Sequence, residues 1–387
     1  MNYVAPAWLP GGNLQTIWPA LYARRVVGEL PQYRRERWTT PDADFIDVDY
    51  MTPSSAPASQ GAVSSEATQL LGVPPCAGRP GAAAMRPEGA DLARRGLARR
   101  PDGLPTVRTR PRTLLVLFHG LEGSSASHYA HAFADFARAH QMDFAVPHFR
   151  GCSGELNLGP RAYHSGDHAE IGWVLQRFRQ QHSGPIVAVG VSLGGNALLR
   201  WAQEMGTAAA QVVSAVAAVS APIDLAAGGH AIGKGFNRMV YTRMFLRSMK
   251  PKALRKLAQH PGLFDRDAML QAKDLYDFDN VFTAPVHGFK NTDDYWLRAS
   301  AKPHLRQIKI PALVVNALND PFVPATSLPS QSEVGTHVTL WQPAHGGHVG
   351  FPQGRPPAHV RAMPDAVGRW LLQHAVDTTR VSTTNHG

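Results

Sequence analysis

The sequence feature that most constrains this chain lies at residues 185–196, where an apolar segment runs into a cluster of glycines. The segment reads Pro-Ile-Val-Ala-Val-Gly-Val-Ser-Leu-Gly-Gly-Asn, and its β-branched first half is typical of a short buried strand. Ser192 follows in a G-x-S-x-G pattern, and the apolar spacing after Asn196 is helical. The pattern predicts a strand, a strained turn that presents Ser192, and a helix. The alternative is a glycine-rich turn with an incidental serine.

The rest of the chain alternates between expected strands and expected helices. Strands are predicted at 114–118, 144–146, 212–219, 312–316 and 338–341, and helices at 129–137, at 167–178 and around 367–371. A first hairpin is predicted from the alternating residues at 33–38 and 44–50. This alternation predicts an α/β fold with a mostly parallel, doubly wound sheet. Between 223 and 310 it stops, and a mainly helical cap insertion is expected there.

Composition divides the chain further. The expected parts are an N-terminal arm and hairpin (1–51), a low-complexity insertion (52–113), two core segments (114–222 and 311–375), the cap (223–310) and a flexible tail (376–387). The insertion holds nine arginines, no lysine and four acids, so 9 − 4 = +5 of the net charge of +10 lies within it. Because it has too few apolar residues to offset its ordering entropy, it is expected to be disordered. Without interleaved aromatics, it does not predict nucleic-acid binding.

Cysteine content and the N-terminus bear on the expected compartment. There are two cysteines, and Cys76 falls in the insertion, so a structural disulfide is not expected and a reducing compartment fits. The first residues lack the basic and apolar regions of a signal peptide. No window approaches the roughly 18 apolar residues of a membrane span. The sequence thus predicts a cytoplasmic protein without a transmembrane segment.

A serine hydroxyl needs a neighbouring base, and that base needs an orienting carboxylate. Downstream of Ser192, Asp320 follows a predicted strand, and His348 lies in a glycine-rich loop after the last one. The order Ser, Asp, His and the glycines that let the ring reach the serine predict a catalytic triad. Alternatives remain: Asp320 caps a turn, His345 is a rival base, and Asp224 is another well-placed acid, interpreted as a cap-entry or helix-capping residue.

A tetrahedral intermediate also needs donors for its oxyanion. One is expected to be the backbone N–H of Leu193, directly after the nucleophile. The other is expected from the loop after residues 114–118, at Leu121, where Gly120 and Gly123 leave the amides accessible. The alternative for this loop is a simple turn.

Several segments together resemble the YheT-like branch of the α/β-hydrolase superfamily. They are Asn13-Leu-Gln-Thr-Ile-Trp-Pro19, Phe118-His-Gly-Leu-Glu-Gly-Ser-Ser-Ala-Ser-His-Tyr129, Phe149-Arg-Gly-Cys-Ser-Gly-Glu155, Tyr163-His-Ser-Gly166, Gly190-Val-Ser-Leu-Gly-Gly-Asn196, Asn319-Asp-Pro-Phe322 and Gly346-Gly-His-Val-Gly-Phe351. The resemblance implies an α/β-hydrolase fold and a carboxylic-ester hydrolase, of carboxylesterase or lipase-like type, with no cofactor or metal. The resemblance assigns the role of nucleophile to Ser192, that of the acid to Asp320 and that of the base to His348. The insertion at 52–113 departs from the family.

The expected substrate is a small-molecule ester, with short-to-medium or lipid-like acyl groups, because the cap is rich in methionine and aromatic residues. Residues 234–256 hold eight basic residues and no acids. If helical, this region presents a basic stripe of Arg243, Arg247 and Lys250, which would favour transient contact with anionic lipid. Its other interpretation is a solvated face. An acyltransferase, a thioesterase or a binding protein without turnover would fit the same fold. Cys152 is interpreted as a structural loop residue.

Overall fold

The computed structural model describes residues 2–52 and 111–375. Most of the predicted insertion at 52–113, with Cys76, lies outside these described residues, as does the tail at 376–387.

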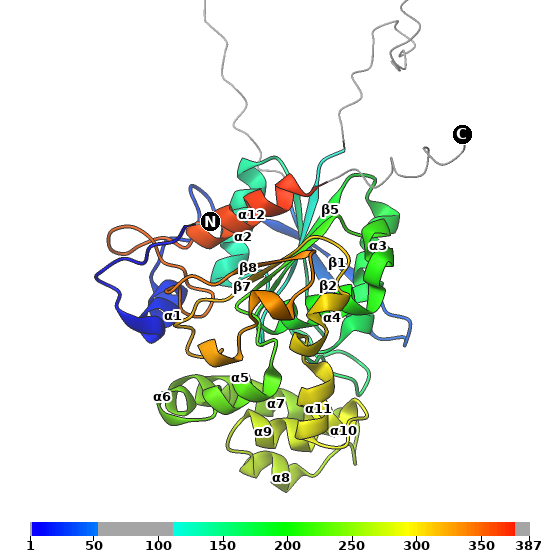
Figure 1. Ribbon diagram of the computed structural model, residues 1–387. Helices are drawn as coiled ribbons and strands as arrows, with labels where there is room; N and C mark the ends of the chain where they lie inside the picture. Colours follow the sequence, from blue (N-terminus) through cyan, green and yellow to red (C-terminus); the bar gives the residue numbers. More distant parts are fainter. Residues whose placement is uncertain (1, 53–110, 376–387) are drawn as a thin grey trace, which may run out of the picture. The chain divides into compact units, whose positions relative to one another are not determined.

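Within the described residues, one sheet of eight strands forms in the order β1-β2-β4-β3-β5-β6-β7-β8 (Figure 1). The strands are β1 Tyr33–Thr39, β2 Phe45–Met51, β3 Leu114–Phe118, β4 Asp143–Pro147, β5 Ile186–Val191, β6 Ala215–Val219, β7 Ala312–Val315 and β8 Val338–Trp341. The β1–β2 and β2–β4 pairs are antiparallel, and every pair from β4 to β8 is parallel. The predicted mostly parallel α/β fold is confirmed.

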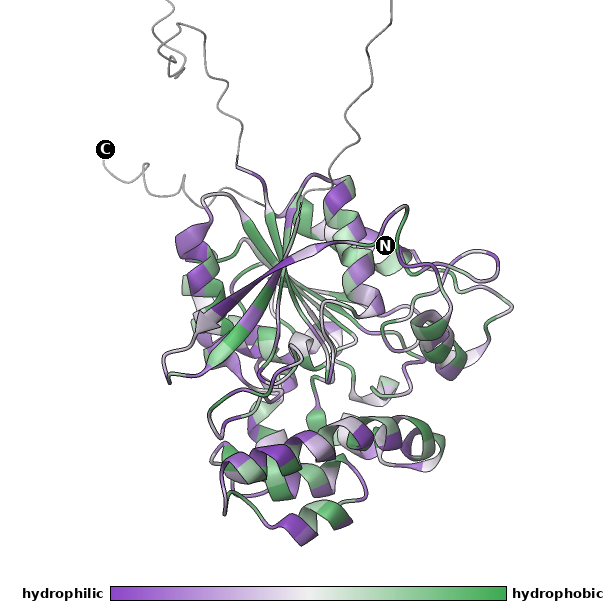
Figure 2. Cartoon of the chain, turned by 180° about the vertical axis from the view of Figure 1, so that it is seen from behind, coloured by the Kyte–Doolittle hydropathy of each residue, from purple (hydrophilic) through white to green (hydrophobic). Residues whose placement is uncertain are grey.

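The central strands β3, β5, β6 and β7 are buried and apolar along their length, because helices cover both faces of the sheet there. The covering helices are α2 His128–Ala139, α3 His168–Gln181, α4 Leu193–Met205 and α12 Ala362–Gln373, with short helices η1 Gly206–Gln211, η4 Lys302–Gln307, η5 Ala325–Ser327 and η6 Gln331–Glu333. Successive β3 residues point to opposite sides: Leu115 packs in the cluster with α2 and α12, and Val116 in the cluster with α3 and α4. Figure 2 shows the resulting pattern, with hydrophobic colour along the central strands and mixed colour on the helices.

A group of helices at residues 225–299, here called the helical segment, lies apart from the two sheet faces (Figure 1). It contains α5 Leu225–Ile232, α6 Gly235–Asn237, η2 Arg238–Thr242, α7 Arg243–Gln259, α8 Arg266–Gln271, α9 Leu275–Phe278, η3 Asp279–Thr283, α10 Ala284–Val286 and α11 Thr292–Ala299. Asp224, Asp265, Asp274 and Asn291 cap α5, α8, α9 and α11 through side-chain oxygens that accept backbone N–H bonds. No helix in the described ranges has the length and apolar character that a membrane span requires.

The N-terminal arm contains a helix that the sequence analysis did not predict. This helix, α1, runs over Gly11–Leu21 and includes Pro19. Its weak periodicity hid it, because it packs against loops rather than against a helix-covered sheet face. Gln15 and Thr16 are among its buried residues, so the buried side of α1 is partly polar.

Candidate active site

Ser192 lies in a tight turn between β5 and α4, with φ 53° and ψ −119°. A positive φ at a non-glycine residue costs on the order of 1–3 kcal/mol and persists only where the surroundings enforce it. Here the backbone is crowded: a Cβ on Gly190 would lie 2.4 Å from the carbonyl oxygen of Gly194. A Cβ on Gly194 would lie 2.5 Å from the carbonyl oxygens of Phe118 and His119. The glycines of the motif therefore let the turn form against the end of β3.

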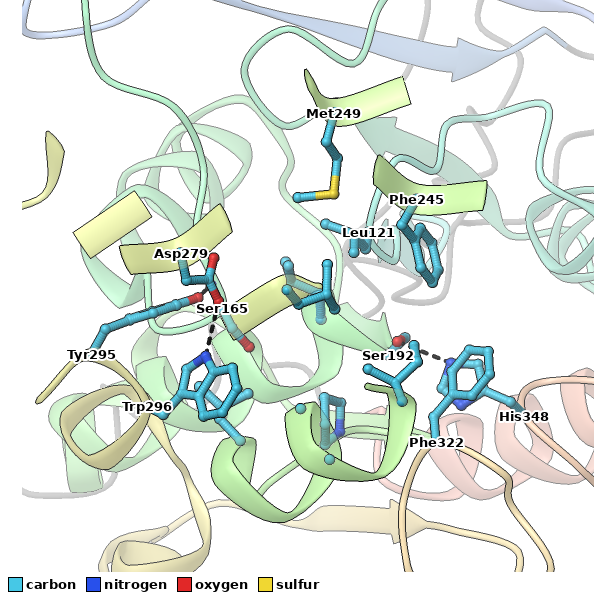
Figure 3. A pocket seen from close by; sticks show the side chains of 17 residues that line it. Leu121, Ser165, Ser192, Phe245, Met249, Asp279, Tyr295, Trp296, Phe322 and His348 are labelled. Carbon is cyan, nitrogen blue, oxygen red and sulfur yellow. Dashed lines mark hydrogen bonds between the residues drawn. The ribbon is translucent and has the colours of Figure 1, made fainter. Parts of the chain in front are cut away.

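The loops that follow β7 and β8 bring Asp320 and His348 to Ser192. The Nε2 atom of His348 lies 3.0 Å from the Ser192 Oγ (Figure 3). Its Nδ1 atom lies 2.9 Å and 3.2 Å from the two carboxylate oxygens of Asp320. Because β5, β7 and β8 are parallel, their following loops meet at one edge of the sheet. The structure thus unites three residues that are far apart in sequence.

The surroundings of the imidazole favour one tautomer. A carboxylate only accepts hydrogen bonds, so Nδ1 carries the hydrogen and Nε2 is left to accept from the Ser192 hydroxyl. Asp320 is itself fixed, because its Oδ1 accepts from the backbone N–H of Phe322 at 2.8 Å. The Phe322 ring lies against the imidazole with 4.2 Å between ring centroids. Asp320 and His348 are both buried.

The rival residues lie in other environments. Asp224 accepts a hydrogen bond from the N–H of Ala227 at 3.0 Å and caps α5. His345 is exposed, and its Nδ1 lies 3.4 Å from the side-chain amide nitrogen of Asn319. Neither forms a hydrogen bond with Ser192 in the described part of the chain.

The loop after β3 packs directly on the serine turn. A Cβ on Gly120 would lie 3.2 Å from the Ser192 Cβ. Among the described residues, the backbone N–H groups of Leu121 and Leu193 have no hydrogen-bond acceptor, whereas the N–H of Gly120 donates to the Tyr129 hydroxyl at 2.9 Å. The two predicted oxyanion donors are therefore free for a ligand atom.

Buried side chains hold this loop in place. The Nδ1 of His119 is 2.8 Å from the carbonyl oxygen of Gly120, and its Nε2 accepts from the Phe149 N–H at 3.1 Å. Burial lowers the pKa of His119 to about 3, so the ring stays neutral and keeps both contacts. The Tyr163 hydroxyl accepts from the N–H of Glu122 at 3.0 Å and donates to its carboxylate at 2.9 Å.

Helix α1 supports the loop that carries His348. This support was not predicted from the sequence. The Thr16 hydroxyl accepts from the His348 N–H at 2.8 Å. The Gln15 side-chain oxygen accepts from the Gly346 N–H and from the Asn319 side-chain amide, both at 2.9 Å. One helix therefore fixes the loops that carry Asp320 and His348. The sequence signal for this support is the motif at 13–19, which contains Gln15 and Thr16 but whose polar residues had no assigned role.

Two of the glycines around His348, Gly347 and Gly350, approach α1 closely. The sequence predicts that the glycines of this loop let the ring reach the serine, and the close approach to α1 is a second role. A Cβ on Gly350 would lie 1.8 Å from the carbonyl oxygen of Gln15, and one on Gly347 would lie 2.8 Å from that of Gly12. These glycines therefore make room for α1.

A cavity, here called the first lobe, opens above Ser192 and His348 (Figure 3). Its other walls come mostly from the helical segment, including Phe245, Met249 and Trp296. A second lobe adjoins it. The lobes share Leu121, Leu193, Met249, Asp279 and Tyr295. Asp279 had no assigned role in the sequence analysis, because nothing in its sequence context separates it from a helix-capping aspartate.

Two sequence interpretations change or gain support. The predicted stripe of Arg243, Arg247 and Lys250 is incomplete, because Lys250 is half-buried and donates to the carbonyl oxygen of Leu270 at 2.9 Å.

Burial raises the pKa of the Cys152 thiol to about 12, which is the opposite of what a thiolate nucleophile requires. In residues 2–52 and 111–375, no three metal-binding side chains converge.

Comparison with known proteins decides the family. A family model described as the alpha/beta hydrolase fold matches residues 113–354. The chain is 41% identical to the Escherichia coli protein YheT over 241 residues, which cover 61% of this chain and 70% of YheT. The chain belongs to the α/β-hydrolase family. Within that family its similarity to YheT places it in the YheT-like branch, as the sequence motifs predicted.

Other family members are more distant. The chain is 28% identical to human phospholipase ABHD3 over 271 residues, 70% of this chain and 65% of that protein. It is 24% identical to the Saccharomyces cerevisiae monoacylglycerol lipase over 270 residues, 67% of this chain and 60% of the lipase. A solved Pyrococcus furiosus esterase is similar at 16% identity and a TM-score of 0.48, covering 92% of this chain and all of that one.

Proposed function

We propose that the protein hydrolyses carboxylic esters through an acyl-enzyme formed on Ser192. The observation that carries this proposal is the continuous hydrogen-bond chain from the Ser192 Oγ through the His348 imidazole to the Asp320 carboxylate. It begins at a strained turn next to two free backbone N–H groups, the arrangement that acyl transfer requires.

Each group has a defined role in the proposed reaction. The Ser192 Oγ attacks the ester carbonyl carbon while His348 Nε2 takes the hydroxyl proton. The negative charge that develops on the carbonyl oxygen meets the N–H groups of Leu121 and Leu193. The tetrahedral intermediate then breaks its bond to the alcohol oxygen, which receives the proton from His348. Water repeats the sequence, releasing the acid and restoring Ser192. Asp320 stays ionised and stabilises the imidazolium.

The first lobe favours an apolar acyl group of short-to-medium length. Phe245, Met249 and Phe322 line it, and methionine adapts to chains of different shape. Each buried methylene contributes about 0.8 kcal/mol to binding until the chain exceeds the depth of the lobe.

The direct test combines turnover with covalent labelling. The wild-type protein is expected to hydrolyse p-nitrophenyl butyrate and to be labelled by a fluorophosphonate probe. Ser192→Ala is expected to lose both, with turnover falling at least about a thousandfold and an unchanged circular dichroism spectrum. Retention of a tenth of wild-type turnover by the variant would refute the assignment. A wild-type protein that the probe does not label would favour a binding protein.

We also propose that the surface at residues 234–247 contacts anionic lipid. Phe236, Met239 and Met244 are exposed there at 47%, 62% and 56%. The cations Lys234, Arg238, Arg243 and Arg247 are exposed among them, and residues 234–264 contain no acid. Exposed apolar groups interleaved with cations complement an anionic membrane surface. Phe245 of the first lobe follows Met244 directly, so the lobe lies beside this surface.

Vesicle co-sedimentation tests this contact. Binding is expected to phosphatidylcholine vesicles containing phosphatidylglycerol, and it should weaken with salt and with Met239→Ser. The control Leu297→Ser alters another exposed apolar residue, which is 71% exposed, outside the surface. Equal binding to neutral vesicles, or no binding to either, would refute the contact.

A further inference from the structure

Asp279 places a carboxyl group at the junction of the two lobes. It begins η3, a π-helical stretch that follows α9 directly. Such stretches occur frequently at functional sites. Asp279 lines both lobes and lies across the first lobe from Ser192 and His348 (Figure 3).

The protein uses only part of the hydrogen-bonding capacity of this carboxyl group. The Trp296 indole N–H donates to Oδ2 at 2.9 Å, and the Thr283 side chain also hydrogen-bonds to the carboxyl. A carboxylate offers about four acceptor positions. Asp279 is half-buried although it is enclosed by helices, because part of its surface lines the cavity. Acceptor positions therefore remain for a ligand.

No cation offsets the charge of Asp279 within the described ranges, since none of their ion pairs includes it. Burial accordingly raises its pKa to about 6. Because this value lies above the ordinary aspartate value of 3.8, ionisation of Asp279 lowers the stability of the folded state as pH rises from about 4 to about 6. A carboxyl group that costs stability and faces a cavity is typical of a ligand-binding role.

The second lobe is lined by three cations as well as apolar side chains, and each of these cations already has a partner. The Nζ of Lys256 donates to the carbonyl oxygens of Asn157 and Gly159 at 2.6 and 2.7 Å. Lys252 pairs with Glu122 at 2.9 Å. Arg150, the third cation of this lobe, pairs with Asp42, Asp44 and Glu170. Because these three cations already have partners, the second lobe favours a neutral polar group of a ligand over an anionic one.

We propose that the natural ester carries a free hydroxyl group, and that Asp279 accepts a hydrogen bond from it at the entrance to the second lobe. This inference rests on the proposed ester hydrolysis and narrows its substrate class to hydroxylated esters. A site that hydrogen-bonds a substrate hydroxyl discriminates strongly against the analogue that lacks it, because the buried acceptor is then left unpaired. The apolar part of the same ester occupies the first lobe.

Matched ester pairs test the inference and locate the hydroxyl. One pair is glyceryl mono-octanoate and propyl octanoate, which differ on the alcohol side. The other is methyl ω-hydroxyoctanoate and methyl octanoate, which differ on the acyl side. The wild-type protein is expected to prefer the hydroxylated member of one pair by about tenfold or more in kcat/KM, the scale of a hydrogen bond to a charged group. The preferred pair identifies the side that reaches Asp279.

Variants then assign the preference to Asp279. Asp279→Leu is expected to reduce the ratio of kcat/KM values to about one. The ratio compares two esters on the same variant, so a change in the cavity that affects both esters equally does not alter it. Asp279→Asn keeps an acceptor for Trp296, so it is expected to fold with an unchanged or higher Tm at pH 7.5 and to lose part of the preference. Asp267→Asn, which alters an exposed aspartate of α8, is the matched control and should behave as wild type.

The outcomes separate this inference from the proposed function. A wild-type protein that hydrolyses both members of each pair equally, or Asp279 variants that keep the full preference, would overturn the subsite and leave ester hydrolysis intact. Absence of Ser192-dependent hydrolysis of any ester would refute the function itself. Binding of octyl glyceryl ether to Ser192→Ala, lost on adding Asp279→Leu, would support the subsite without turnover.

Discussion

The two walls of the first lobe differ in how they are held. On the wall at the edge of the sheet, the polar atoms of Asp320 and His348 have partners from separate elements, and backbones approach closely through glycines. The opposite wall consists mostly of apolar side chains from the helical segment, with Asp279 as its carboxyl group. The first wall fixes geometry to within hydrogen-bond distances, whereas the second fixes only shape and polarity. We therefore expect reaction chemistry to depend on the first wall and substrate choice on the second.

The largest effect is expected on the first wall, at the base. His348→Ala should lower kcat by up to about a millionfold, as loss of the base in a serine triad does. His345→Ala should keep most of the activity, because its exposed ring does not reach Ser192. Steady-state kinetics on p-nitrophenyl butyrate would measure both. The reverse pattern would identify His345 as the base.

The next largest loss of kcat is expected on changing the acid of the triad, Asp320. Asp320→Asn is expected to lower kcat by about ten-thousandfold, because an amide cannot hold the imidazole in the required tautomer. Asp224→Asn should instead lower thermal stability by about 1 kcal/mol or less, as weakening of a helix cap does. Kinetics and thermal melts of both variants would test this. If Asp224→Asn proved more damaging to kcat, the orienting carboxylate would be Asp224.

A smaller effect is expected from the helix behind the first wall. Thr16→Val removes the acceptor for the His348 N–H without changing side-chain shape, leaving a buried donor unpaired. We expect kcat to fall about tenfold with KM unchanged, since the substrate is not contacted. Thr339→Val, on an exposed position of β8, is the control. A raised KM with unchanged kcat would contradict a positioning role.

The smallest effect belongs to the second wall. Phe245→Ala enlarges the first lobe, so the preferred acyl chain should lengthen and the specificity constant for longer esters should rise about fourfold per newly buried methylene. p-Nitrophenyl esters from acetate to laurate, compared with the wild type, would show the shift. A wild-type specificity constant that is highest at acetate and falls steadily would mean that this wall forms no acyl pocket.

The sequence by itself determined the fold and the local geometry around Ser192. A strand, a crowded turn and a helix are properties of neighbouring residues, so residues 185–196 predict them directly. The roles of Asp320 and His348 could also be predicted from their order in the chain. Each follows a predicted strand, and parallel strands end at the same edge of a sheet. The choice between His345 and His348 stayed open in the sequence, and only the spatial arrangement distinguishes their environments.

Only the tertiary structure decided which residues support and complement that chemistry. Thr16 and His348 are separated by 332 positions, and no periodicity records a hydrogen bond across that distance. Asp279 resembles the capping aspartates near it in sequence, yet its helix turns it into the cavity while theirs cap helix ends. A side chain acquires such a role from the surface that packs against it, and that surface exists only once distant segments of the chain have come together.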